Sequence, residues 1–170
     1  VERIDEIISY HRQRAAVAGR SALHPPLLIR PVLQRIIDSL HKVHRERALE
    51  CRLEVEEDFH LRADHGDLFE LFGNLLENAF KHAHRRLWVH TSKGCICIED
   101  DGEGIAAAQV ERLLRRGERA DERHPGQGIG LSLAHEIVAQ YDGALHIDRS
   151  PLGGARVSVC LPHAVGTRNA

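Results

Sequence analysis

Hydrophobic residues recur along this chain with two different periods, which predict helices and strands. A period of three to four residues, typical of an amphipathic helix, occurs in three segments: 31–48, from Asp64 or Asp67 to 84, and 130–141. A period of two residues, typical of a half-buried strand, occurs in five: 51–55, 87–91, 95–99, 144–149 and 155–161. Strands mixed with three helices predict a two-layer α/β sandwich.

The middle helix is expected to have two chemically distinct faces. Asn74, Asn78 and Lys81 lie within roughly 60° of one another around its axis. The opposite side is apolar: Leu68, Phe69, Phe72, Leu75, Leu76, Ala79, Phe80 and Ala83. A solvated surface is one interpretation of these side chains. Because Asn is a mediocre helix former, two of them one turn apart beside a lysine favour the alternative, a function. Amide oxygens suit Mg²⁺, and a lysine can meet phosphate as a point charge.

Two glycine-rich segments flank the expected elements. Residues 100–105 (DDGEGI) follow a strand, and residues 126–131 (GQGIGL) precede a helix. Glycine admits positive φ and close approach of a ligand to the backbone, and free N–H groups at a helix start attract anions. Neither segment is a dinucleotide-binding fingerprint or a Walker A loop, because the strand–glycine–helix unit and the G-K-[ST] sequence are missing.

Composition and charge narrow the class of protein. The 170 residues include 23 basic and 25 acidic side chains and only 4% aromatics, which favours one soluble domain and argues against nucleic acid as a partner. We expect no membrane span or signal segment within these residues. The chain begins with Val and contains no Met, so we expect it to be part of a longer gene product.

The cysteines and histidines show no metal-ligand spacing. Cys51, Cys95, Cys97 and Cys160 are widely separated apart from one C-x-C pair, which predicts reduced thiols in a reducing compartment. A metal site at Cys95 and Cys97 is the alternative, but buried packing is favoured. The 13 histidines are scattered.

Taken in order, residues 74–83 (NLLENAFKHA), 100–105 and 126–131 resemble the N, G1 and G2 boxes of the ATP-binding domain of bacterial sensor histidine kinases. Residues 116–119, 125–128, 140–143 and 152–156 resemble the PhoQ subfamily in particular. The resemblance implies the Bergerat fold of the GHKL superfamily, shared with DNA gyrase B, MutL and Hsp90. It further implies a mixed, mostly antiparallel sheet of about five strands against three helices.

The resemblance also implies a role for each matching residue. Asp100 would accept a hydrogen bond from the adenine amino group. Asn78 would bind Mg²⁺ with help from Asn74 and Gln127, Lys81 would contact phosphate, and Arg119 would reach the terminal phosphates. The remaining residues would contact the base or shape the pocket and its lid, which spans about 106–125: His82, Gly102, Gly104, Ile105, Gly126, Gly128, Ile129, Gly130 and Leu131. We expect Asn78, Lys81, Arg119 and Gln127 to take part in catalysis.

Several positions depart from the family pattern. His124 stands where PhoQ relatives carry an arginine, with Arg123 one position earlier, and Leu113–Leu114 replaces a common phenylalanine of the lid. No segment matches the phosphoacceptor motif. His135-Glu136-Ile137 imitates its first three positions, but it lies on a helix and we interpret His135 as structural.

Three functions remain open. Hydrolysing relatives place a glutamate general base one turn before the metal-binding Asn, where this chain has Asn74, and an amide cannot take a proton. This favours transfer of the ATP γ-phosphate to a protein histidine, a protein-histidine kinase activity. The alternatives are an ATPase of the same superfamily, using Glu77 or Glu70, and a nucleotide-binding interaction module without catalysis.

The resemblance also implies an organisation and partners. Residues 1–18 would end a dimerisation helix, 19–163 would form the catalytic domain, and 164–170 a tail. The cofactors would be ATP and Mg²⁺. The partners would be the parent's own phosphoacceptor domain and a PhoP-like response regulator. The fragment is expected to be monomeric, and its parent a homodimer whose cytoplasmic part this is, anchored in the inner membrane.

Overall fold

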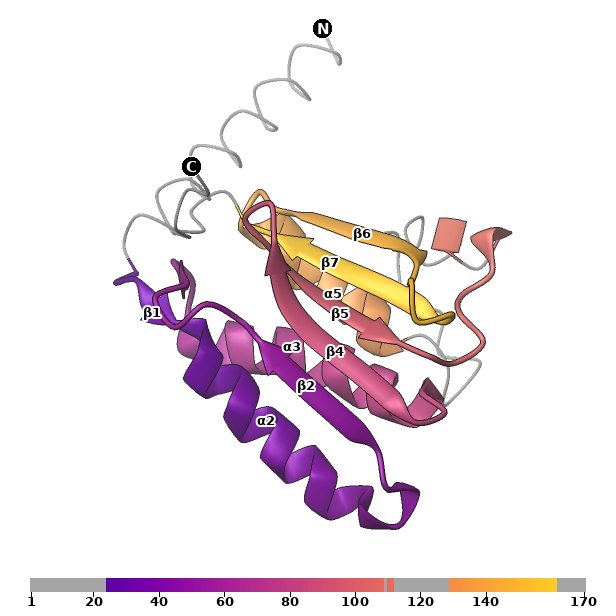
Figure 1. The fold of residues 1–170 in the computed structure, drawn as a ribbon. Helices are drawn as coiled ribbons and strands as arrows, with labels where there is room; N and C mark the ends of the chain where they lie inside the picture. Colours follow the sequence, from indigo (N-terminus) through magenta and orange to yellow (C-terminus); the bar gives the residue numbers. More distant parts are fainter. Residues whose placement is uncertain (1–23, 109, 112–128, 162–170) are drawn as a thin grey trace, which may run out of the picture.

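The computed structural model describes residues 24–108, 110–111 and 129–161. They form a five-stranded sheet in the order β2-β4-β5-β7-β6, with three helices on one face (Figure 1). The strands are β2 (Glu50–Glu54), β4 (Arg86–Ser92), β5 (Cys95–Asp100), β6 (Ala144–Arg149) and β7 (Ala155–Cys160). Only β2 and β4 are parallel; the other neighbours are antiparallel. The predicted two-layer sandwich is confirmed.

Each helix follows a predicted segment, with shifted ends. They are α2 (Ile29–Val43), α3 (His65–His82) and α5 (Ile129–Gln140). Helix α2 ends five residues before the predicted Ala48, and a short 3₁₀ turn η1 (Arg45–Arg47) follows. A second, two-stranded sheet of β1 (Leu27–Leu28) and β3 (His60–Leu61) was not predicted, because two-residue strands show no period.

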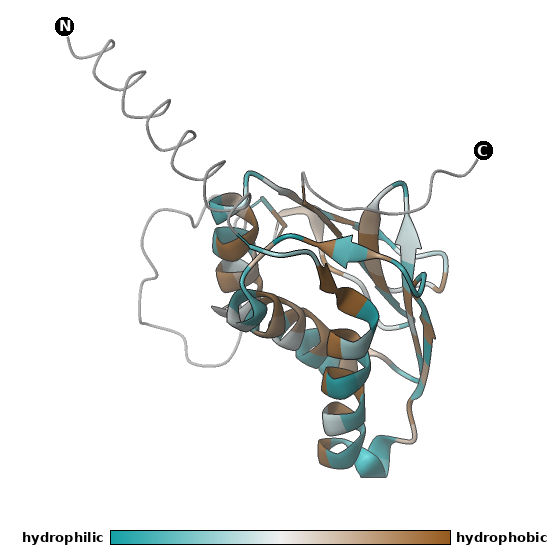
Figure 2. Cartoon of the chain, turned by 90° about the vertical axis from the view of Figure 1, so that its left-hand side faces the viewer, coloured by the Kyte–Doolittle hydropathy of each residue, from teal (hydrophilic) through white to brown (hydrophobic). Residues whose placement is uncertain are grey.

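Helix α3 lies between α2 and α5 and packs against β5. Asp64 begins it: its carboxylate accepts hydrogen bonds from the N–H groups of Gly66 and Asp67, which decides between the two predicted caps. The predicted apolar face is buried, except that Phe69 is 39% exposed. Turned by 90°, the helices show interspersed hydrophobic and hydrophilic residues, as amphipathic elements do (Figure 2).

Tyr141, just after α5, ties that helix to the start of α3. Its hydroxyl donates to the Asp67 carboxylate and accepts from the Asp64 N–H. Burial and the bond to Asp67 raise the pKa of Tyr141 to about 12, so the hydroxyl stays protonated at neutral pH. The two helices that carry the predicted nucleotide-binding segments are thereby held together at this end.

The prediction of reduced thiols is wrong for Cys95 and Cys160, which form a disulfide with a Cα–Cα distance of 4.3 Å. The register of β5 and β7, with Ile96 opposite Val159, places the two cysteines opposite each other. Their 65-residue separation hides this in the sequence. Cys97 is buried as predicted, and burial raises the pKa of the free Cys51 thiol to about 11.

None of the helices in the described ranges is long and apolar enough to cross a membrane.

Candidate nucleotide-binding site

Asp100, at the end of β5, carries a carboxylate that the backbone holds in place. The residue is 6% exposed. Its Oδ1 accepts hydrogen bonds from the N–H groups of Gly102 at 2.9 Å and Ala155 at 3.2 Å, and its carbonyl accepts from Gly154 N at 3.1 Å. These bonds orient the carboxylate and leave Oδ2 as the oxygen that can accept a hydrogen bond from a ligand.

Two glycines around Asp100 leave no room for a side chain. A Cβ on Gly154 would lie 2.0 Å from Asp100 Oδ1, and one on Gly102 would lie 2.3 Å from the His82 carbonyl oxygen. Gly104 has a φ of +82°, which favours glycine. Gly102 and Gly104 were predicted as pocket residues. The requirement at Gly154 was missed, because the sequence does not show which glycine of the Gly153–Gly154 pair faces Asp100.

The polar face of α3 is half-buried at Asn74 and Asn78 and exposed at Lys81 and His82. Asn74 Nδ2 donates to the Glu70 carbonyl at 2.8 Å. Its Oδ1 lies 3.3 Å from where a Cβ on Gly130 would stand, so the amide oxygen faces the start of α5. Lys81 Nζ pairs with Glu77 Oε1 at 2.9 Å. This surface ion pair is weak, so Lys81 can exchange it for another anion.

The end of α3 is fixed by Arg47, which the sequence analysis missed. Its guanidinium donates to the carbonyls of Phe80, Lys81 and Ala83. These carbonyls have no partner within the helix, and a cation there also complements the helix dipole. No sequence signal reveals this contact, because 33 to 36 residues separate the partners.

Asp101 ties the connection after α3 to the connection after β5. Its Oδ1 accepts from the backbone N–H groups of His84 and Arg85, each at 2.9 Å. Burial acts to raise the pKa of Asp101, but backbone hydrogen bonds, including those from Arg85, Arg86 and His84, outweigh it, so this pKa lies below its usual value.

The start of α5 completes the described site. Gly130 is half-buried beside Asn74, and the next residue, Leu131, is buried. Ile105, which follows Gly104 in the chain, is half-buried against the core. A helix start presents free N–H groups and the positive end of the helix dipole, which suit an anion. Ile129 is the first residue of this helix.

The structure therefore brings the N, G1 and G2 segments together as far as it describes them. Contacts join His82 to Gly102 and Asn74 to Gly130. Arg119, Gly126, Gln127 and Gly128 lie outside the described residues, as do most of the predicted lid, Leu113–Leu114, His124 and residues 1–18. His135 lies half-buried on α5. Within the described ranges, no three His, Cys, Asp or Glu side chains cluster to hold a metal.

Residues 63–165 match the family described as histidine kinase-, DNA gyrase B- and HSP90-like ATPase. The chain belongs to this family. Its matched region is an ATP-binding domain of the histidine kinase type. The fold is shared with the mycobacterial sensor histidine kinase MprB (TM-score 0.69, 22% identity, 84% of this chain and all of that one). It is also shared with the ATP-binding domain of PrrB from Mycobacterium tuberculosis (TM-score 0.64, 25% identity, 82% of this chain and 97% of that one).

Two curated relatives are similar over nearly the whole chain. The two-component sensor PhoQ of Pseudomonas aeruginosa is 40% identical over 159 residues, which are 91% of this chain and 36% of that protein. The sensor protein PhoQ of Escherichia coli K12 is 33% identical over 167 residues, 94% of this chain and 34% of that protein. The chain thus spans about a third of the length of these relatives.

Proposed function

We propose that this chain is the catalytic domain of a two-component sensor histidine kinase of the PhoQ type. It transfers the γ-phosphate of ATP to a histidine on a dimerisation domain, for relay to a response regulator. The observation that carries the proposal is the buried Asp100 carboxylate, oriented by backbone N–H groups and enclosed by Gly102 and Gly154. A carboxylate held in this way can select a base that carries an amino group, because Oδ2 accepts a hydrogen bond from that group.

The residues around Asp100 fit a nucleotide base. Asp100 Oδ2 accepts a hydrogen bond from the adenine amino group, while Oδ1 remains bonded to Gly102 and Ala155. Gly102 and Gly104 let the base approach the backbone, and Ile105 and Leu131 supply apolar surface. His82 is assigned to the base because it ends α3 beside Gly102.

The amide face of α3 fits Mg²⁺. Asn78 and Asn74 would hold the ion, with Gln127 as a further ligand. The Nδ2 of Asn74 is engaged by Glu70, which leaves Oδ1, a hard oxygen, facing the start of α5. When bound, the ion neutralises charge on the phosphates.

Phosphate binding is assigned to the residues beyond the amides. The N–H groups at the start of α5, around Ile129 and Gly130, attract the phosphates, with Gly126 and Gly128 permitting the close approach. Lys81 leaves Glu77 and pairs with phosphate. Arg119 stabilises the transferred charge.

Transfer is favoured over hydrolysis because Asn74 occupies the position of the general base in hydrolysing relatives. Its amide donates to the Glu70 carbonyl and cannot accept a proton. Glu77, the alternative base, is half-exposed and paired with Lys81.

We further propose the partners that this function requires. They are the phosphoacceptor domain of the parent protein and a PhoP-like response regulator. The parent is a homodimer in the inner membrane with this domain on the cytoplasmic side, while the isolated domain is a monomer.

The test mixes the purified domain with the separately produced dimerisation helices of its parent and ATP labelled at the γ-phosphate. We expect acid-labile phosphate on the helices, and none with the Asn78→Ala variant. Calorimetry of the same proteins should show Mg·ATP binding that is lost on Asp100→Ala.

Two outcomes contradict the proposal. Unlabelled helices, when a competent kinase labels the same preparation, would remove the kinase function. Nucleotide binding unchanged by both substitutions would remove the site and leave an interaction module without catalysis.

A further inference from the structure

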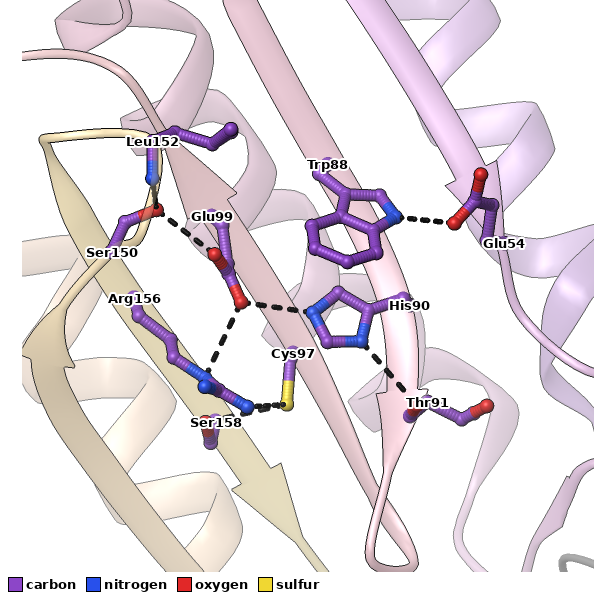
Figure 3. A network of polar contacts seen from close by, with 10 residues as sticks. All are labelled: Glu54, Trp88, His90, Thr91, Cys97, Glu99, Ser150, Leu152, Arg156 and Ser158. Atoms are coloured by element: carbon purple, nitrogen blue, oxygen red, sulfur yellow. Dashed lines mark hydrogen bonds and ion pairs between the residues drawn. The ribbon is translucent and has the colours of Figure 1, made fainter.

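A buried carboxylate lies on the sheet face opposite the helices, directly before Asp100 in the chain. Glu99 is 1% exposed. Its Oε1 lies 2.9 Å from His90 Nε2 and 3.4 Å from Arg156 Nε, and its Oε2 accepts a hydrogen bond from Ser150 Oγ at 2.9 Å (Figure 3). Because successive residues of a strand face opposite sides, Glu99 points away from the nucleotide site and Asp100 toward it.

Ser150 connects Glu99 to the turn between β6 and β7. Its hydroxyl donates to Glu99 and accepts from the Leu152 N–H at 3.0 Å. Its backbone N–H donates to the Gly154 carbonyl at 2.9 Å, and its carbonyl accepts from Gly153 N at 3.0 Å. The turn of residues 150–154 is therefore closed by backbone bonds, and the Ser150 side chain anchors it to Glu99 of β5.

The end of this turn and the first residue of β7 supply two of the hydrogen bonds that hold Asp100. Gly154 N donates to the Asp100 carbonyl, and Ala155 N donates to Oδ1 of its carboxylate. A continuous series of bonds thus runs from the Glu99 carboxylate through Ser150 and the turn to the Asp100 carboxylate on the other face of the sheet.

We propose that Ser150 and Glu99 are positioning residues for purine recognition, because their hydrogen bond fixes the turn that leads into Ala155, whose N–H group orients the Asp100 carboxylate. This inference rests on the proposed function. Neither residue touches the base; they determine how well the site distinguishes a purine with a 6-amino group from one without it. A buried carboxylate–hydroxyl bond suits this role because it is charge-assisted, directional and shielded from water.

The test substitutes Ser150→Ala and measures the affinity for ATP and for purine riboside triphosphate, which lacks the 6-amino group. We expect the affinity for ATP to fall roughly three- to tenfold, the typical effect of losing one hydrogen bond, and that for purine riboside triphosphate to change less than about twofold. A general loss of folding would weaken both nucleotides equally, so the ratio of the two affinities reports positioning.

Ser158→Ala is the matched control. Ser158 is also a buried serine on this sheet face, but its hydroxyl contacts Cys97 Sγ and not the turn. This variant should keep the ratio of the two nucleotide affinities that the unsubstituted domain has. Amide hydrogen exchange in the nucleotide-free domain gives a second readout. The N–H groups of Gly154 and Ala155 should exchange faster in Ser150→Ala, and in Ser158→Ala at the same rate as in the unsubstituted domain.

The inference is overturned if Ser150→Ala weakens both nucleotides equally, changes neither affinity, or does no more to the ratio than Ser158→Ala. In each case the proposed function stands when the unsubstituted domain prefers ATP to purine riboside triphosphate. If the unsubstituted domain binds neither nucleotide, the proposed function is overturned and this inference with it.

Discussion

The two ends of the candidate site are built in different ways. At the base end, Asp100 is held by N–H groups from two separate segments, 102 and 154–155, and glycines enclose it. At the phosphate end, the described bonds of the Asn74 and Lys81 side chains stay within α3. The base end is therefore fixed by tertiary contacts before ligand binding, whereas the side chains of α3 can change partners when a charged ligand arrives.

The largest expected effect is at Gly154, where the base end tolerates no Cβ. Gly154→Ala should abolish nucleotide binding and lower the free energy of unfolding by roughly 3 kcal/mol, because the methyl group would overlap the Asp100 carboxylate. Urea unfolding and calorimetry measure both. The control is Gly73→Ala on α3, where a Cβ meets nothing within 4 Å. It should stabilise the domain by about 0.5–1 kcal/mol. Equal behaviour of the two variants would contradict the described packing.

Asp100→Asn tests the roles of the two carboxylate oxygens separately. Asn can keep the bonds from Gly102 and Ala155 at its oxygen, but its amino group donates where Oδ2 accepts. We expect the affinity for ATP to fall roughly 10- to 100-fold with little change in stability, as measured by calorimetry and thermal unfolding. Binding of purine riboside triphosphate should change much less; an equal loss for both nucleotides would argue against recognition of the amino group.

Asp101 makes the base end sensitive to acid. Because its pKa in the folded state is lowered, its contribution to stability is complete above the unfolded value near pH 4 and is lost as the pH falls through the folded value. Asp101→Asn should cost on the order of 1 kcal/mol at pH 6 and progressively less below about pH 4. Urea unfolding across this range measures it. Asp58→Asn, at an exposed position, serves as control. A stability loss for Asp101→Asn that grows as the pH falls would contradict a lowered pKa for Asp101.

The smallest effect is expected at the phosphate end. Glu77→Gln removes the ion pair with Lys81, and the free energy of unfolding should change by less than about 0.5 kcal/mol. ATP affinity should stay the same or rise slightly, because Lys81 no longer has to leave a carboxylate. Phosphate release by the domain alone, if any occurs, should not fall. Sustained release that Glu77→Gln eliminates would instead support the ATPase alternative.

Local patterns predicted most of the elements because helix and strand periods are properties of neighbouring residues. Helices α3 and α5 and the five strands of the main sheet lie within a few residues of their predicted positions. The misses have local causes: α2 ends at Val43 and gives way to the 3₁₀ turn η1, which the left-handed Ala48 (φ 47°) then ends, and β1 and β3 are too short to show alternation.

For the site, the sequence by itself determined which residue types face the same side of α3 and that Gly102 and Gly104 closely follow Asp100. Only the tertiary structure decided which atoms meet: Ser150 with Glu99, Gly154 with Asp100, Arg47 with the end of α3, and Cys95 with Cys160. The reason is physical, because these contacts join residues 33 to 65 positions apart, and their distances depend on strand register and layer packing. No period of a single segment encodes either quantity.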